Sequence, residues 1–455
     1  MKLFFSLILK AAMLLGFYFW DVATSTSDNR SLNLDTELNA GTIDRVRKTF
    51  RSDQIQPIPH RINNRLSDFE DFEYLESGIA AMMGKYNIKG ASIAVAKDGR
   101  LIFAKGLGYA DKEANETVEP RHLFRIASVS KLITAVTIMK LAEMDLLAID
   151  DRVFGKEGIL NDGRYLDYTD PRIEEITVRH LMNHSAGWNR RYGDPVGRHH
   201  IIARAMNKDW REITAPDIVH HTLRNQLHFT PGSRTSYSNL GYVILGEVIK
   251  AITGEDYESF VRNAILAPLG IFDMRIGGSL FEDRFENEVK YYAIEDRQMY
   301  PDDGSNPIAY GGNNIEILGA AGGWIASPAE ILKLVVAIDS IQTVQSILSP
   351  ESIELMTDHN LSGGHPMGWA GTDARGNWWR TGTLSGTSAL VVRQNDGISW
   401  AVFFNSSTYK GIFLPVETLR EMRIALNTIT EWPDHDLFYH FETRPFLYPD
   451  IAELR

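Results

Sequence analysis

The sequence contains no cysteine and fewer basic than acidic residues. Without cysteine the chain has no disulfide bond, no thiol nucleophile, no cysteine-ligated zinc or iron–sulfur cluster, and no lipid-modified N-terminal cysteine. The 47 Lys and Arg residues against 59 Asp and Glu residues give a formal net charge of −12. The sequence has no run rich in Lys and Arg. We therefore expect no nucleic acid partner, because binding to phosphates needs clustered positive charge.

Motifs of several other enzyme classes are also missing. The sequence has no G-x-S-x-G, so it lacks the nucleophile elbow of an α/β-hydrolase. It has no Walker loop and no G-x-G-x-x-G. His180 and His184 have a four-residue spacing that metal ligands on a helix use, but no Glu follows His180. The H-E-x-x-H pattern of zinc proteases is therefore not met.

The chain has one long apolar stretch, at its N-terminus. Leu3 to Trp20 is apolar apart from an interruption at Lys10, and a Ser- and Thr-containing segment follows. This pattern predicts that residues 1–24 are a secretory signal peptide or an N-terminal anchor. Lys10 counts against an uncleaved membrane span, which needs about 20 apolar residues. We expect a secreted or periplasmic location, and no membrane contact beyond this segment.

Composition divides the rest of the chain into a linker, one large domain and a tail. Residues 25–65 are polar and form the predicted linker, residues 66–428 the domain, and residues 429–455 a C-terminal tail. Apolar periodicity and turn signals predict helices and hairpins within the domain. In chain order they are a helix over 69–83 that stops at Gly84, strands at 90–96 and 101–106, a helix that follows Ser128 and reaches Leu146, a helix at 243–252, strands at 388–393 and 398–405, and a helix at 415–428.

The first chemical motif is S-x-x-K at Ser128 and Lys131. A serine hydroxyl needs a base to act as a nucleophile near neutral pH. If Ser128 begins a helix, Lys131 lies one turn along the same face and within hydrogen-bond reach. Burial lowers the pKa of an ammonium group, so Lys131 is a candidate base or proton relay. Taken alone, the motif is better explained by a helix-capping serine and a solvated lysine.

Two further motifs lie downstream. Y-x-N at Tyr237 and Asn239 offers a candidate proton acceptor and an amide that holds either the substrate or Lys131. At the start of a predicted strand, Arg380 would keep the site electropositive and attract a substrate carboxylate. The residues that follow it are Thr381, Gly382 and Thr383. The glycine would let an extended substrate approach the strand, and the N–H of its successor would donate to an oxyanion, as would the N–H groups at the helix start.

Together, the order and spacing of these motifs resemble the serine beta-lactamase and penicillin-binding-protein superfamily. The likeness is to the branch with class C beta-lactamases, LACTB-like hydrolases, esterases and D-alanyl-D-alanine carboxypeptidases. In that branch S-x-x-K comes first, Y-x-N follows, and a K-T-G or H-x-G triplet lies near the end. Segments 176–187, 268–270 and 322–327 also resemble family landmarks. The resemblance covers about residues 70–428, and it gives the two histidines at 180 and 184 a structural role.

The resemblance implies an α/β (α+β) fold. An antiparallel sheet built from both chain ends would be flanked by helices, beside a helical subdomain at about 145–300, with the site at their junction. Ser128 would attack an ester, amide or lactam carbonyl of a small molecule or peptide and form an acyl-enzyme. Lys131 and Tyr237 would manage the proton, and the N–H groups of Ser128 and Thr383 would hold the oxyanion. No metal or organic cofactor is required for this chemistry.

One residue departs from the family pattern. Arg380 stands where the family usually has Lys or His. Arginine keeps the positive charge but cannot release a proton, so it serves as an electrostatic group and not as a proton shuttle. This puts efficient beta-lactam turnover in question more than acyl transfer in general. The alternative is a catalytically reduced binding or scaffold protein of the same fold. The acyl group, the acceptor and the oligomeric state are left open.

Overall fold

The computed structural model describes residues 62–294, 307–339, 346–358, 360 and 363–439. The predicted signal peptide or anchor lies outside these ranges, as do most of the linker and the end of the tail. Within them, no helix has the length and apolar character needed to cross a bilayer.

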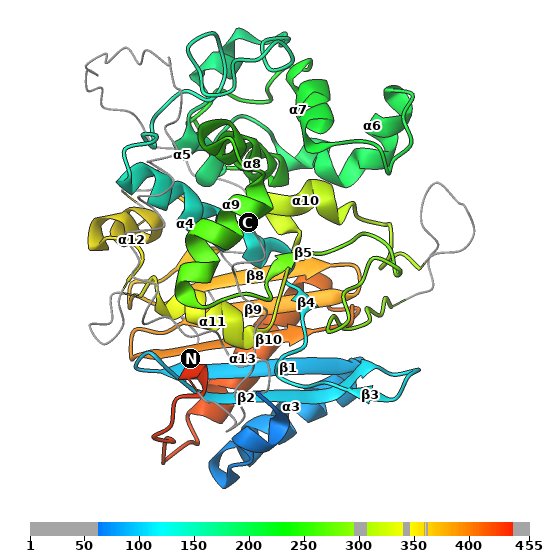
Figure 1. Cartoon of the computed structure of the whole chain (residues 1–455), viewed down its shortest axis with the longest axis vertical. Coiled ribbons are helices and arrows are strands. Elements are labelled where there is room, and N and C mark those ends of the chain that lie inside the picture. Colours follow the sequence, from blue (N-terminus) through cyan, green and yellow to red (C-terminus); the bar gives the residue numbers. More distant parts are fainter. Residues whose placement is uncertain (1–61, 295–306, 340–345, 359, 361–362, 440–455) are drawn as a thin grey trace, which may run out of the picture.

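A seven-stranded antiparallel sheet lies at the centre of the domain, in the order β3-β2-β1-β10-β9-β8-β7. The strands are β1 (Gly90–Lys97), β2 (Arg100–Asp111), β3 (Glu116–Thr117), β7 (Gly371–Thr372), β8 (Trp378–Leu384), β9 (Thr387–Arg393) and β10 (Ile398–Phe404). β1 pairs with β10, with Ala94 opposite Ala401, so the two ends of the domain form one sheet (Figure 1). The predicted antiparallel sheet is confirmed.

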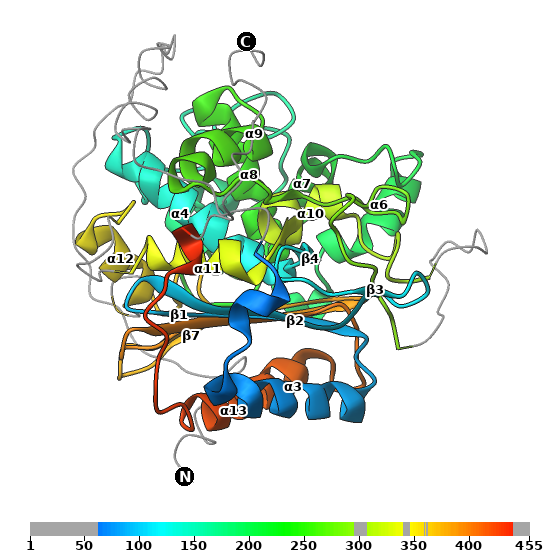
Figure 2. The ribbon, with the colours of Figure 1, turned by 60° about the horizontal axis from the view of Figure 1, so that its bottom comes forward.

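One face of the sheet is covered by α3 (Glu73–Tyr86) and α13 (Leu414–Leu426). The two helices lie side by side beneath the sheet in Figure 2. Their apolar side chains pack with those of the strands into a separate core that includes Leu75, Trp400 and Met422. The three layers are therefore helices, sheet and helices.

The first helix of the domain differs from its prediction at both ends. The segment from Asn64 to Phe72 forms short 3-10 turns, and α3 continues past Gly84 to Tyr86. Gly84 is exposed and tolerated in the helix, while Asn87, with φ of 56°, adopts the left-handed conformation that ends it. The prediction that Gly84 stops the helix is wrong, because a capping residue three positions later does so.

The opposite face carries most of the helices and the larger core. They are α4 (Ser130–Glu143), α5 (Val178–Met182), α6 (His199–Ala205), α7 (Ala215–Leu223), α8 (Asn239–Thr253), α9 (Tyr257–Val261), α10 (Ile315–Gly322), α11 (Pro328–Val336) and α12 (Pro350–Thr357). α4 ends before Leu146, contrary to the prediction, because Asp145 has a φ of 58°. A small sheet of β4 (Phe124–Arg125), β6 (Trp324–Ala326) and β5 (Arg275–Ile276) lies between these helices and the large sheet.

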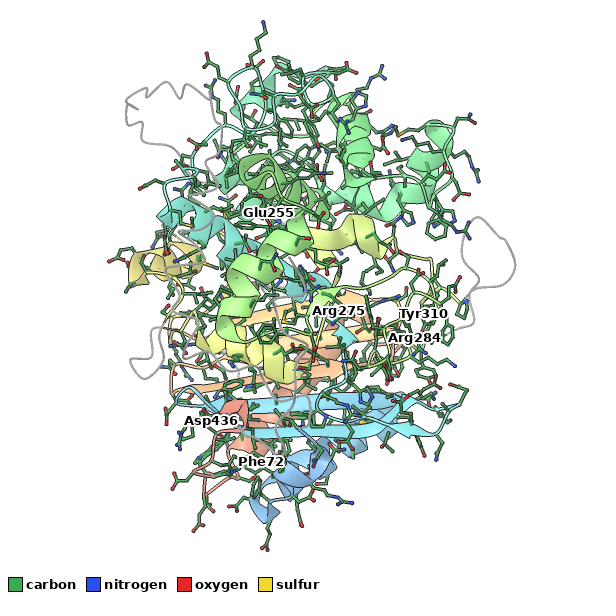
Figure 3. The ribbon with its side chains drawn as sticks, viewed as in Figure 1. Phe72, Glu255, Arg275, Arg284, Tyr310 and Asp436 are labelled. Carbon is green, nitrogen blue, oxygen red and sulfur yellow. The ribbon has the colours of Figure 1, made fainter. Side chains whose placement is uncertain are left out.

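Both flanking segments contact the outer edge of β2. The backbone N–H of Leu101 donates to Asp436 at 3.0 Å, and His435 lies 2.9 Å from the carbonyl oxygen of Ile102. On the linker side, the N–H of Gly106 donates to Asn64 at 2.7 Å. Asp436 lies beside this strand edge in Figure 3. These contacts satisfy donors that an open sheet edge would otherwise expose.

Candidate active site

Ser128 lies where the small sheet passes into α4. Its 3-10 turn (Ala127–Val129) directly precedes that helix, and Ala127 holds a left-handed φ of 48°. A non-glycine residue in this region carries backbone strain, which is common beside reactive groups. Because the turn opens the helix, Ser128 lies at its N-terminus, where backbone N–H groups lack helical partners.

The hydroxyl of Ser128 meets both candidate proton acceptors. Its Oγ lies 2.6 Å from the hydroxyl oxygen of Tyr237 and 3.3 Å from Nζ of Lys131. Tyr237 comes from the segment before α8, more than a hundred residues along the chain from the serine. The structure therefore brings together the two motifs that sequence spacing alone could not join.

Lys131 is fully buried and held by oxygen atoms. Its Nζ donates to Oδ1 of Asn239 at 2.7 Å and to the carbonyl oxygen of Ala321. Burial lowers the pKa of Lys131 to about 8; the charge of Arg380 adds to this, and Tyr237 opposes it. Of the two roles predicted for Asn239, the structure shows the one in which it orients the lysine.

Tyr237 is a stronger acid than an ordinary tyrosine. Burial raises the pKa of its hydroxyl, but the positive charges of Lys131 and Arg380 outweigh burial and lower the pKa to about 8. Nη2 of Arg380 donates to its oxygen at 3.2 Å. A phenol with such a pKa exchanges a proton readily near neutral pH.

The side chain of Arg380 is directed into the site and away from solvent. Its side chain is 1% exposed, and its Nε donates to the backbone carbonyl oxygen of Ser128 at 2.7 Å. The fork of the guanidinium thus spans the nucleophile's backbone and the Tyr237 hydroxyl. A buried group with these contacts is placed to set the charge of the site, and poorly placed to reach a substrate carboxylate.

Gly382 permits the close approach of β8 to the nucleophile. A Cβ at this position would lie 2.1 Å from the carbonyl oxygen of Ile126 and 3.1 Å from the N atom of Ser128. The sequence argument assigned this glycine to substrate access, whereas the contacts assign it to packing of strand against turn. Its neighbours Thr381 and Thr383 lie opposite Leu390 and Ser388 in the sheet. The backbone of Thr383 therefore directly follows the residue that packs against the turn of Ser128.

Two contributors escaped the motif search. His184 is buried against Tyr237, with ring centroids 4.6 Å apart, and its Nδ1 accepts from the N–H of Ser238 at 3.3 Å. Burial holds the pKa of His184 well below its ordinary value, so the ring is neutral at pH 7. Asp194 accepts from the N–H of Asn239 at 2.8 Å. The sequence marked His184 only through the family-like segment 176–187 and its spacing from His180, and no pattern marked Asp194.

His180 and His184, which have the spacing of metal ligands, play different roles in the structure. Nδ1 of His180 accepts from the N–H of Thr177 in the capping box of α5, while His184 faces Tyr237. Among the described residues, no group of three or more His, Asp or Glu is arranged to hold a metal ion. The aromatic residues Trp188, Tyr310, Trp324 and Trp378, which the sequence left open as pocket lining or core, are all buried in the larger core.

Comparison with known families decides the identity of the fold. The family model described as "Beta-lactamase" matches residues 75–414. The chain belongs to the beta-lactamase family. Penicillin-binding protein 4* of Bacillus subtilis is 27% identical over 206 residues, which cover 45% of this chain and 41% of that protein. Protein flp of Staphylococcus aureus is 28% identical over 185 residues, 41% of this chain and 34% of flp. The matches thus span less than half the length of these relatives.

Solved structures of the beta-lactamase fold agree over most of the chain. A penicillin-binding protein homologue from Pyrococcus abyssi, described as octameric, is 26% identical with a TM-score of 0.59, covering 78% of this chain and 76% of that one. The D-amino acid amidase from Ochrobactrum anthropi SV3, in complex with D-phenylalanine, is 22% identical with a TM-score of 0.62. It covers 79% of this chain and 99% of its own, and this likeness shows the fold alone.

Proposed function

We propose that this beta-lactamase-family protein is a serine hydrolase that acts through an acyl-enzyme on an ester, amide or lactam. The observation that carries the proposal is the 2.6 Å contact between Ser128 Oγ and the hydroxyl of Tyr237, whose pKa is lowered to about 8. A nucleophile in contact with a base of matched pKa is the arrangement that acyl transfer requires.

The proton follows a short path in this mechanism. As Ser128 Oγ attacks the carbonyl carbon, its proton passes to the oxygen of Tyr237. The positive charges of Lys131 and Arg380 favour the deprotonated form of Tyr237, which accepts this proton. Tyr237 then gives this proton to the departing alcohol or amine. In the second half-reaction, a water molecule transfers a proton to Tyr237 and attacks the acyl carbon. Tyr237 returns this proton to Ser128 Oγ as the bond between Oγ and the acyl carbon breaks, which releases the carboxylic acid and regenerates Ser128.

The carbonyl oxygen of the substrate needs hydrogen-bond donors, because negative charge develops on it during the attack. The N–H of Ser128 lies at the N-terminus of α4, and the backbone of Thr383 follows Gly382, which contacts the same turn. We assign these two N–H groups to the oxyanion, by analogy with other acyl-transfer sites in which paired backbone donors stabilise the tetrahedral state.

We choose the candidate substrates from the names of similar proteins. One structural neighbour is named a D-amino acid amidase, and two relatives are named for penicillin binding. Small amides and D-alanyl peptides therefore enter the tests beside simple esters. We also propose that the chain is exported by its N-terminal segment, which N-terminal sequencing of the mature protein and cell fractionation would test.

Trapping the acyl-enzyme tests the proposed function directly. Intact-mass spectrometry after exposure to p-nitrophenyl esters, D-alanyl peptides and beta-lactams should show one added acyl group on the wild type. The variant Ser128→Ala should show none, whereas Ser233→Ala, which alters an exposed loop serine, should be labelled like wild type. Equal labelling of wild type and Ser128→Ala would exclude Ser128 as the nucleophile.

The alternative of a catalytically reduced binding protein makes the opposite prediction. It rested on the unusual Arg380 and on the unmatched tail, yet the guanidinium contacts Tyr237, and residues 434–438 contact the sheet edge. A scaffold protein would form no covalent adduct with any compound in the panel and would retain reversible ligand binding in Ser128→Ala.

A further inference from the structure

The positive charges of the site differ in their access to solvent. Lys131 has a relative exposure of 0% and Arg380 of 1%, and both donate to protein oxygens within the site. Arg190 is exposed, and its guanidinium carbon lies 5.7 Å from the centroid of the Tyr237 ring. It is thus a solvent-facing cation that borders the proposed proton acceptor.

The backbone that carries Arg190 is held in place. Its own N–H donates to the hydroxyl of Ser236 at 3.0 Å, and the N–H of Asn189 donates to Nδ1 of His228 at 3.0 Å. The ring of Tyr192 stacks on His228 with centroids 4.3 Å apart. These contacts tie the short 3-10 turn Arg190–Tyr192 to the chain segment that leads into Tyr237. A cation on a fixed backbone loses less conformational freedom when it binds a charged group.

The guanidinium of Arg190 has no carboxylate partner within the described part of the chain. Among the residues that the structure describes, Arg190 forms no ion pair and no side-chain hydrogen bond. Asp194, the acid nearest along the chain, is already used by the N–H groups of Val196 and Asn239. All five N–H donors of Arg190 are therefore open to an incoming group.

We propose that Arg190 recognises a carboxylate on the substrate, so that the site selects anionic over neutral esters and amides. The inference rests on the proposed hydrolase function and deepens it. The planar fork of an arginine matches the two oxygens of a carboxylate, and a charged pair formed beside the partly buried ring of Tyr237 is less screened than one in open solvent. Arg380 is less available for this role, because its side chain is 1% exposed and already donates to Ser128 and Tyr237.

Matched ester pairs test the proposal. On the acyl side, the mono-p-nitrophenyl ester of glutaric acid carries a free carboxylate, and its methyl ester does not. On the leaving-group side, butyrate esters of 4-hydroxybenzoic acid and of its methyl ester form the same kind of pair. Wild type should prefer the charged member of at least one pair in kcat/KM. Arg190→Gln should reduce that preference about tenfold, the lower end for a charged hydrogen bond.

Arg234→Gln is the matched control. This exposed arginine also lies over an aromatic ring, 4.5 Å from the centroid of Phe229, and is near Tyr237 in the chain. It should leave the charged-to-neutral ratio unchanged, while added salt should weaken the wild-type preference. Equal ratios for wild type and Arg190→Gln in both pairs overturn the role of Arg190 and leave the proposed hydrolase standing. No turnover of any ester by wild type overturns the proposed function, and this inference with it.

Discussion

Replacing Arg380 with glutamine should move the pH dependence of the reaction rather than abolish it. The guanidinium Nη2 lies 3.2 Å from the oxygen of Tyr237. At that distance a unit charge pair interacts with about 5 kcal/mol at an effective dielectric constant of about 20, an upper limit since solvent relaxes around the variant. Loss of an adjacent opposite charge commonly shifts a pKa by about 1–3 units. The pKa of Tyr237, now about 8, should rise by that amount.

The direction of the effect follows from both groups of the pair. Arg380 stabilises the phenolate of Tyr237 and destabilises the ammonium of Lys131, so it favours loss of a proton from either. Without it, the pair holds its proton to higher pH. If the form that has lost one proton is reactive, kcat/KM at pH 7 should fall by about 10- to 1,000-fold, because each pKa unit is a factor of ten. The loss should shrink as the pH rises.

The assay is kcat/KM for a p-nitrophenyl ester between about pH 5 and pH 10, with Ser128→Ala as the blank for spontaneous hydrolysis. Arg380→Lys is the control, since it keeps the charge and loses the two-point contact; its acid limb should stay closer to that of wild type. A uniform loss in Arg380→Gln at every pH, with the acid limb unmoved, would refute the electrostatic reasoning. It would show that the guanidinium acts only by holding β8 against the nucleophile.

Three further substitutions probe the remaining contacts. Lys131→Met should lower kcat/KM at least about 100-fold and abolish accumulation of the acyl-enzyme in mass spectra, since Tyr237 loses its largest source of positive charge. Gly382→Ala forces a Cβ to within 2.1 Å of the Ile126 oxygen; it should cost about 1–3 kcal/mol in denaturant unfolding and reduce activity, and an unchanged midpoint would contradict the close approach. His184→Phe keeps a ring beside Tyr237 but leaves a buried backbone N–H without its acceptor, so the free energy of unfolding should fall by about 1–3 kcal/mol.

The sequence predicted the sheet and the site's main chemical groups because these depend on short-range patterns. Apolar runs bounded by Asp-Gly turns define β1 and β10 and their hairpins, and helical spacing of apolar residues defines α4. The i, i+3 spacing of Ser128 and Lys131 places them on adjacent turns whatever surrounds them. Element ends were less predictable, since Asn87 rather than Gly84 ends α3.

What the sequence could not predict depends on contacts between distant segments. Arg380 is buried and donates to the carbonyl oxygen of Ser128, although the two residues lie 252 positions apart in the sequence. The use of Gly382 as a packing contact appears only when β8 lies on the turn at Ile126. His184 likewise gains its position beside Tyr237 from the fold, and no local pattern distinguishes it from an ordinary core histidine.

Arginine at position 380 concentrates the proton chemistry on one pair of residues. A lysine or histidine there would add a group that exchanges protons, whereas the guanidinium stays charged at every pH of interest. Its fork reaches two atoms through separate nitrogens, with Nε donating to the carbonyl oxygen of Ser128 and Nη2 to the hydroxyl of Tyr237. The proton that Ser128 releases must therefore be carried by Lys131 and Tyr237, whose pKa values are both about 8. With both groups matched and Arg380 fixed in its charge, loss of the first proton from the Lys131–Tyr237 pair should set the acid limb of the reaction, and loss of the second proton should set its alkaline limb.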